Sequence, residues 1–318
     1  MARKRILTID GGGIRGVFSA AIIERMEAVT GKPCRELFDC FYGTSTGAIL
    51  AAGLATGLSA RDLKQFYITK GARVFTKIPW WHVIERNLFW TYTAEPLEQE
   101  LQAFFGDRTV FGVEPLLSVI AKDTVRGVPR FFNNFPDTKA RHPEADALLR
   151  EAIRASTAAP TFFPPKGFYI DGGISSYNNP SYAAFIGATK YLRWPGGPEH
   201  LAIYSVGTGY HPPVIPAGEL DDRNKLQMAA YVASELMDDI NLLQNQIMKR
   251  SEDDLGLCWY RRYTIRFDAA SFRNFGIDPT GIDFDALAAL DGVDYVRELA
   301  TIGERVGERL VSPNDFLG

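Results

Sequence analysis

The sequence is poor in cysteine and lacks a long apolar run. Both shortages limit the classes of protein to which it can belong. Three of the 318 residues are cysteines, and their spacing matches no metal site: Cys34, Cys40 and Cys258. We expect free thiols in a reducing compartment. The longest small apolar stretch, residues 48–58, is far below the ~20 residues that span a bilayer, and the apolar run behind the basic N-terminus is too short for a signal peptide. These absences predict a soluble, cytoplasmic protein.

An excess of one charge sign is also missing. Lysine and arginine number 35 against 38 aspartates and glutamates, which gives a formal net charge of −3. No global field therefore draws the chain to a nucleic acid polymer or to anionic lipid, and any membrane contact has to be local. With 46% hydrophobic and 23% charged residues, the composition is typical of an ordinary globular protein.

Strand-like and helix-like segments alternate along the first two thirds of the chain. Buried strands are predicted at residues 5–9, 38–42, 116–121, 130–132, 168–170, 202–206 and 260–267. Helices are predicted at residues 17–29, 46–56, 144–156, 180–192, 225–249 and 293–310. The helix over 225–249 has apolar residues at 4-3-4 spacing, namely Leu236, Ile240, Leu243 and Ile247, and Ser59–Asp62 has the pattern of a capping box that opens a further helix. This alternation predicts an α/β fold with helices on both faces of a sheet. We expect one continuous domain, with a core over 1–210 and a helical C-terminal layer over 211–318.

The segment Gly43-Thr44-Ser45-Thr46-Gly47 has the G-x-S-x-G pattern of a nucleophile elbow, a tight turn that exposes one serine hydroxyl. An apolar strand precedes it and a helix of small residues follows, as an elbow requires. Ser45 then lies at a helix N-terminus, where partial positive charge helps to stabilise a forming oxyanion. The alternative is a loop serine that only caps the helix.

The segment Asp10-Gly11-Gly12-Gly13-Ile14-Arg15-Gly16 follows a second apolar strand. Its bare backbone N–H groups can face an anion, and a serine that attacks a carbonyl needs such donors for the developing oxyanion. The same glycines fit the dinucleotide-binding pattern, which requires an acidic residue at the end of the next strand. Glu36 and Asp39 lie at the other end of that strand, which leads into Ser45. The two motifs together favour an acyl hydrolase over a dinucleotide-binding oxidoreductase.

A serine nucleophile needs a base, and histidines are scarce. None of the four has a sharp local signature, and only the last is a plausible triad member: His82, His142, His200 and His211. Asp171 ends a predicted strand and precedes Gly172-Gly173, which let the chain turn sharply and leave the carboxylate accessible. An aspartate that only forms a turn is the alternative. The scarcity of histidine makes Asp171 the candidate base.

Four motifs in this order and spacing resemble the patatin-like phospholipase family: Asp10–Gly16, Gly43–Gly47, Ala158-Ala159-Pro160 and Asp171-Gly172-Gly173. Val206-Gly207-Thr208-Gly209 and the closing helices are also similar, so the resemblance covers nearly the whole chain. The third catalytic motif reads Asp-Gly-Gly where many members have Asp-Gly-Ala. The residues that support the motifs are Arg15, Gly16, Gly43, Gly47, Gly172 and Gly173.

The resemblance implies a three-layer fold with a mostly parallel central sheet. It also implies a catalytic dyad of Ser45 and Asp171 without histidine, and an oxyanion hole from the backbone of Gly11, Gly12 and Gly13. The implied activity is hydrolysis of fatty acyl esters in phospholipids through an acyl-enzyme, with no cofactor and no metal. A housekeeping esterase or lysophospholipase and a non-catalytic lipid-binding protein remain as alternatives.

The resemblance implies partners as well. Bacterial members include secreted lipase toxins and lipases that cyclic nucleotides switch on in defence against phage, and a compact chain without a secretion module is more similar to the second group. We therefore expect a phospholipid substrate, peripheral contact with the inner membrane in the active state, and a cyclic oligonucleotide activator. Housekeeping activity without nucleotide control is the alternative.

One stretch is unusually aromatic. Three of the five tryptophans fall within eleven residues, and the aromatic side chains are Trp80, Trp81, Phe89, Trp90 and Tyr92. Basic residues are interspersed, which favours contact with a membrane interface or a pocket for a lipid chain. The alternative is that these side chains fill the core beneath a long loop.

Overall fold

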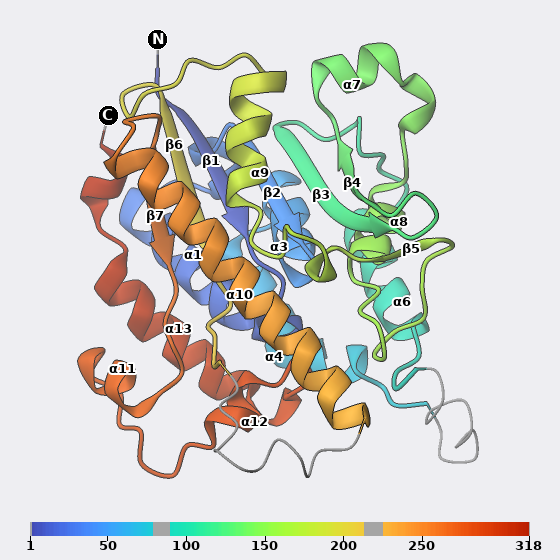
Figure 1. Cartoon of the computed structure of the whole chain (residues 1–318), viewed down its shortest axis with the longest axis vertical. Helices are drawn as coiled ribbons and strands as arrows, with labels where there is room; N and C mark the ends of the chain where they lie inside the picture. The colour runs from blue at the N-terminus through green and yellow to red at the C-terminus, as the bar shows by residue number, and fades with distance from the viewer. Residues whose placement is uncertain (1, 79–89, 213–224, 318) are drawn as a thin grey trace.

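The computed structural model describes residues 2–78, 90–212 and 225–317 (Figure 1). In this part of the chain the strands form one sheet of order β4-β3-β2-β1-β6-β7, and β5 pairs with β3 outside that row. The strands are β1 (Lys4–Ile9), β2 (Cys40–Thr44), β3 (Leu116–Asp123), β4 (Val128–Asn133), β5 (Tyr169–Asp171), β6 (Leu201–Val206) and β7 (Trp259–Tyr263). All neighbours pair in parallel except β4 and β5, which run antiparallel to β3. The predicted α/β class with a mostly parallel sheet is confirmed.

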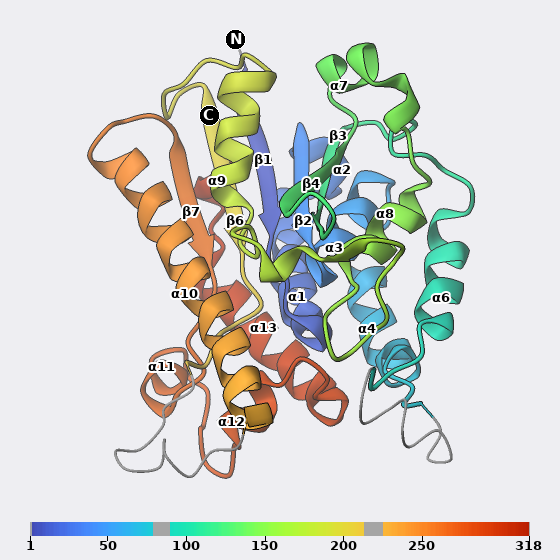
Figure 2. The same cartoon turned by 45° about the vertical axis from the view of Figure 1, so that its right-hand side comes forward.

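Helices cover both faces of this sheet, as Figures 1 and 2 show. One face carries α1 (Gly16–Thr30) and α3 (Thr46–Ala55), with α4 (Ala60–Val74) and α13 (Val296–Leu310) packed on α1. The opposite face carries α9 (Ser181–Ile186) and α10 (Lys225–Asp253). The remaining helices are α2 (Cys34–Leu37), α6 (Glu95–Phe105), α7 (Pro136–Arg141), α8 (Leu149–Ser156), α11 (Ala269–Asn274) and α12 (Phe284–Ala288). In the described segments, no helix has both the length and the apolar character needed to cross a membrane.

The two faces of the sheet bury two separate cores, and β1 contributes to both. Leu7 and Ile9 pack into the cluster on the α1 and α3 side, whereas Ile6 packs into the cluster on the α9 and α10 side. Side chains alternate between the faces of a strand, so a strand that is covered on both faces is buried at nearly every position. This explains why the central strands are mostly apolar in the sequence, with a few small polar residues such as Thr8 and Ser118.

Several predicted elements are present with different ends. The strand predicted over 38–42 is β2, two residues further along, and the strand predicted over 260–267 ends at Tyr263. The helix predicted from residue 144 begins at Leu149, after a short 3-10 turn that starts at Pro143. Ser59 forms the predicted capping box, in which its hydroxyl accepts from the N–H of Asp62.

The helix predicted over 225–249 is confirmed as α10, but its apolar stripe does not face the core. Leu236 and Leu243 are each 55% exposed, whereas Gln244 and Met248 are buried. The 4-3-4 spacing therefore predicted the helix and not its orientation. Gln244 is buried because α10 contacts the loop that follows β5, where the Gln244 side chain donates to the Ser176 carbonyl oxygen at 2.7 Å. Met248, one turn further along, packs into the core on this side of the sheet.

Candidate active site

β2 and β5 both pair with β3, run in opposite directions, and end next to each other. β2 pairs along β3 as far as Thr44 opposite Ile120, and β5 continues the same row from the other direction as far as Asp171 opposite Ala121. Since Ile120 and Ala121 are neighbours, the carboxyl ends of β2 and β5 meet. Ser45 follows β2 directly, so this pairing brings it to Asp171 across 126 residues of sequence.

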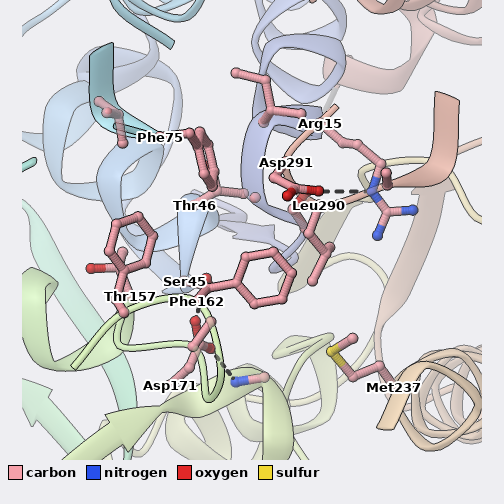
Figure 3. Close-up of a pocket in the computed structure, with 18 of the residues that line it drawn as sticks. Arg15, Ser45, Thr46, Phe75, Thr157, Phe162, Asp171, Met237, Leu290 and Asp291 are labelled. Atoms are coloured by element: carbon pink, nitrogen blue, oxygen red, sulfur yellow. Dashed lines mark hydrogen bonds between the residues drawn. The ribbon is translucent and has the colours of Figure 1, made fainter. Parts of the chain in front are cut away.

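The hydroxyl of Ser45 donates a hydrogen bond of 2.6 Å to Oδ2 of Asp171 (Figure 3). The other carboxylate oxygen, Oδ1, accepts from the backbone N–H of Gly173 at 2.6 Å. A Cβ on Gly173 would lie 3.0 Å from Oδ1 of Asp171 and 2.7 Å from the side-chain oxygen of Asn178. Only glycine allows the backbone this close, which is the physical reason for the second glycine of the Asp-Gly-Gly motif.

Asp171 lies in an apolar environment and is only 4% exposed. Burial raises the pKa of its carboxyl from 3.8 to about 6, and the hydrogen bonds from Ser45 and Gly173 oppose this rise. A carboxylate with a raised pKa is a stronger base than an exposed one, and it is still largely ionised at neutral pH. The electrostatics of the site therefore suit proton transfer from Ser45 to Asp171.

Ser45 has the strained backbone of an elbow, with φ 54° and ψ −125°, immediately before α3. The turn is tight enough that a Cβ on Gly47 would clash with the carbonyl oxygen of Ile9 in β1. Among the other motif positions, Gly16, Gly43 and Gly172 are packed as closely. The buried hydroxyl of Ser156 accepts the Ser45 N–H at 2.9 Å.

The glycine loop passes beside the nucleophile, since a Cβ on Gly11 would lie 3.2 Å from Cβ of Ser45. The N–H of Gly11 donates to the carbonyl oxygen of Asn178 at 3.2 Å and is therefore occupied within the protein. Among the described residues, the N–H groups of Gly12 and Gly13 have no partner. Of the three oxyanion donors that the resemblance implies, the geometry thus leaves Gly12 and Gly13.

Arg15 is 8% exposed and braces the same loop. Its Nε donates to the carbonyl oxygen of Gly12 at 3.3 Å, and its Nη1 donates to that of Gly209 at 3.2 Å. The hydroxyl of Thr208 donates to the carbonyl oxygen of Gly11 at 3.0 Å. The segment Val206–Gly209, which was only one of several similarities in the sequence, therefore supports the loop from behind.

The sequence did not indicate that Arg262 belongs to this site. It forms a bidentate ion pair with Asp10, the residue that begins the glycine loop, with Nη1 2.8 Å from Oδ1. The available signal was a second basic residue in a strand whose neighbours are aromatic. Such a side chain is buried only if it is paired, and no local pattern names the partner.

None of the described histidines hydrogen-bonds to Ser45. His211 lines the same cavity, but its Nδ1 contacts the carbonyl oxygen of Phe267 at 2.6 Å and its Nε2 lies 3.5 Å from Asp285. His200 lies 3.3 Å from Glu199 on the surface. His82 lies outside the described residues.

A cavity of about 560 Å³ opens beside the dyad. Its walls on the α4 side are apolar, and the residues are Ile14, Ile49, Phe66, Val74, Phe75, Leu97, Phe162 and Phe163. Arg15, His211, Asp238 and Asp285 line another part of it, next to α10. In the view of Figure 3, Phe75 and Arg15 both lie above Ser45, with Arg15 further to the right. The size and lining suit a ligand with an apolar chain and a polar group.

The aromatic stretch is only partly described. Tyr92 is 2% exposed, and its ring centroid lies 5.3 Å from that of Phe75 and 5.8 Å from that of Phe163. Tyr92 therefore packs in the core, which was the alternative interpretation of this stretch. Trp90 is partly buried, and Trp80, Trp81 and Phe89 lie outside the described residues.

Comparison with known proteins points to phospholipases. The cGAMP-activated phospholipase of Escherichia coli (strain TW11681) is 29% identical over 222 residues, which cover 65% of this chain and 62% of the relative. That of Vibrio cholerae serotype O1 is 32% identical over 212 residues, covering 59% and 58%. The chain thus spans about three fifths of the length of these relatives. Among solved structures, VipD from Legionella pneumophila aligns with 95% of this chain and 67% of its own, with TM-score 0.40 and 14% identity.

A model of the family described as patatin-like phospholipase matches residues 7–185. The matched segment is more than half of the chain and contains the glycine loop, the Ser45 elbow and the Asp171 turn. With these residues gathered at one end of the sheet and the family pattern present in order, the chain belongs to the patatin-like phospholipase family.

Proposed function

We propose that this protein is a serine lipid acyl hydrolase that cleaves fatty acyl esters of phospholipids through Ser45 and Asp171. The observation that carries the proposal is the 2.6 Å hydrogen bond between the Ser45 hydroxyl and Asp171 at the edge of an apolar cavity. Nucleophile and base are within the distance needed for proton transfer. No histidine of the described segments competes for the hydroxyl.

The reaction follows from these positions. Asp171 accepts the hydroxyl proton while Oγ of Ser45 attacks the ester carbonyl, and the carbonyl oxygen becomes an oxyanion. The N–H groups of Gly12 and Gly13 and the N-terminus of α3 stabilise that negative charge. The proton on Asp171 passes to the leaving alcohol, and Asp171 then activates the water that hydrolyses the acyl-enzyme. No metal takes part in this scheme.

The substrate is a phospholipid at a membrane surface. The apolar wall formed by α4 and the segment around Phe162 and Phe163 accommodates the acyl chain. The part of the cavity beside Arg15 receives the polar group. The protein contacts the inner membrane peripherally during catalysis.

The catalytic core over 1–210 and the helical layer over 211–318 act as one domain. Two contacts between these parts support a single domain. The Asn178 side chain donates to the Asn241 side chain of α10 at 3.2 Å, and Gln244 of α10 donates to Ser176. The helical layer is thereby attached to the loop that carries Asp171.

A cyclic oligonucleotide activates the enzyme in defence against phage. The relatives in Escherichia coli and Vibrio cholerae are both named cGAMP-activated phospholipases, and they support this part of the proposal. An intracellular phospholipase also needs an inactive state, which a ligand can shift. A housekeeping esterase without nucleotide control is the alternative.

The test uses the purified chain and its Ser45→Ala variant with vesicles of mixed bacterial phospholipids. Released fatty acid and lysophospholipid are identified by mass spectrometry, with and without a panel of cyclic di- and trinucleotides. We expect products from the wild type only, and more of them with one of the nucleotides. Equal turnover by Ser45→Ala would exclude the serine hydrolase, whereas full activity that no nucleotide changes would leave the housekeeping alternative.

A further inference from the structure

The backbone conformation of Ser45 has to be stabilised by residues outside the turn. Its φ of 54° is rarely adopted by a residue with a side chain, and such a strained conformation persists only where the surrounding structure enforces it. Ser45 is the N-cap of α3, so no carbonyl group of that helix can accept its N–H. A residue that fixes this N–H controls where the hydroxyl of Ser45 lies.

Ser156, at the end of α8, is that residue. Its hydroxyl accepts the Ser45 N–H at 2.9 Å and donates to the carbonyl oxygen of Ile120 in β3. The side chain is completely buried. One donor and one acceptor function are therefore both used, and both partners are backbone groups.

The second partner lies beside the base. Ile120 precedes Ala121, which pairs with Asp171 in the sheet. The path from the Ser45 N–H through the Ser156 hydroxyl to Ile120 therefore ties the nucleophile to the strand that positions Asp171. A shift of about 1 Å between two reacting groups is enough to lower a rate by on the order of a hundred-fold.

We propose that Ser156 is a positioning residue of the hydrolase, which holds the Ser45 backbone so that its hydroxyl meets Asp171. The proposal rests on the proposed function. Ser156 touches neither substrate nor the reacting atoms, and it acts only through the Ser45 N–H and Ile120. Removing its hydroxyl leaves Ser45 and Asp171 present but misaligned.

The test compares Ser156→Ala with Ser118→Ala. Ser118 lies on β3, is 1% exposed, and its hydroxyl has no hydrogen-bond partner among the described residues. Both variants lose one buried hydroxyl, so they differ in the contacts that the hydroxyl makes. We expect Ser156→Ala to lower kcat on a soluble ester by at least ten-fold with KM within two-fold, and Ser118→Ala to leave both unchanged.

Three further measurements separate positioning from general destabilisation. The Ser45 hydrogen bond lowers the pKa of Asp171, so a displaced Ser45 should shift the acid limb of the pH–rate profile of Ser156→Ala to higher pH. Amide hydrogen exchange of the peptide that contains Ser45 should become faster in Ser156→Ala and not in Ser118→Ala. Ser156→Cys, which keeps a weaker donor of similar size, should give an intermediate kcat.

A kcat of Ser156→Ala within two-fold of Ser118→Ala, with the same acid limb, would overturn the proposal. So would failure of both Ser156 variants to fold, because the hydroxyl would then be structural. If the wild type hydrolyses no ester, the proposed function fails on its own. The exchange experiment still decides the positioning role in that case, since unchanged exchange at Ser45 contradicts it.

Discussion

Arg262 on β7 reaches across β6 to Asp10, which lies at the end of β1. The guanidinium makes two contacts with the carboxylate, one of them 2.8 Å long, and also donates to the Ser205 hydroxyl of β6 at 2.7 Å. Asp10 is 1% exposed. Burial raises the pKa of the Asp10 carboxyl and Arg262 lowers it, so the carboxylate depends on this partner for its charge. The ion pair anchors the start of the glycine loop to the far edge of the sheet.

Arg262→Met should destabilise the protein by about 3 to 5 kcal/mol, because it leaves the Asp10 carboxylate buried without its partner. Asp10→Asn combined with Arg262→Met should recover part of this loss. Urea unfolding measures the free energy of unfolding of the single and the double variant. Arg261→Met, at the neighbouring and 44% exposed position, is the control and should cost less than about 1 kcal/mol. An equal effect at the two arginines would contradict the role of the ion pair.

Ser45→Ala and Asp171→Ala should each lower kcat/KM by roughly a thousand-fold, and the double variant should be no worse than either. The reason is that the serine and the carboxylate act as one unit. Hydrolysis of a soluble ester measures the rates, and a fluorophosphonate probe should label Ser45 in the wild type. His211→Ala should keep at least a tenth of the activity. If His211→Ala is inactive while Asp171→Ala is not, the dyad is wrong.

The activity should depend on the ionisation of Asp171. Because its pKa is about 6 and the base must be deprotonated, kcat/KM should rise with pH, reach half its maximum near pH 6 and stay level up to pH 8. An ordinary histidine titrates in the same range, so the His211→Ala variant is the necessary comparison. Its acid limb should remain in place. Loss of that limb would assign it to the histidine.

The same carboxyl should make stability fall as pH rises. The pKa of the Asp171 carboxyl is raised from 3.8 to about 6 in the folded state. Between these pH values the folded protein therefore binds more protons than the unfolded chain. Its contribution is complete below pH 3.8 and is lost as pH rises through about 6, which amounts to about 3 kcal/mol.

Asp171→Asn cannot titrate and should therefore become more stable relative to wild type between pH 4.5 and pH 7.5. Urea unfolding at the two pH values measures the difference. Asp278→Asn serves as the control, because hydrogen bonds with Thr280 lower the pKa of that exposed carboxyl from 3.8. Its contribution to stability changes only below that pH, so the relative stability of Asp278→Asn should stay almost constant between pH 4.5 and pH 7.5. A relative stability of Asp171→Asn that does not change with pH would contradict the burial effect.

Gly12→Ala should lower kcat by on the order of a hundred-fold, because it displaces an oxyanion donor. The added methyl does not enter the cavity. It would clash with the side chain of Thr208, which pushes the loop away from Ser45. Thr208→Gly should restore part of the activity of Gly12→Ala. No recovery in the double variant, measured against Thr208→Gly alone, would show that the loop has a different constraint.

The proposed nucleophile, Ser45, and the proposed base, Asp171, could be selected from the sequence because their signals are short-range. A G-x-S-x-G elbow needs its glycines within two residues of Ser45, and the Asp-Gly-Gly turn needs Gly173 two residues after Asp171. Steric requirements of this kind involve only neighbouring residues, so the local sequence shows them. The same holds for the capping box at Ser59.

Contacts between distant segments could not be selected in this way. Nothing near Asp10 indicates Arg262, and nothing near Ser45 indicates Ser156, because each pair is joined only when separate strands and helices pack. The 4-3-4 stripe of α10 was misleading for a related reason. Its polar face contacts the loop after β5, so Gln244 is buried while Leu243 is exposed.

The sequence by itself determined the α/β class, the order of the motifs and the choice of Ser45 and Asp171 as candidates for the dyad, since apolar periodicity and turn sterics act over a few residues. The tertiary structure decided that β5 runs antiparallel into the end of β2, which sets the 2.6 Å contact between the two side chains. It also decided that the N–H of Gly11 has a backbone acceptor, whereas those of Gly12 and Gly13 have none in the part of the chain that the structure describes. These features depend on strand pairing across more than a hundred residues, and such pairing is fixed by the burial of both sheet faces at once and not by any local pattern.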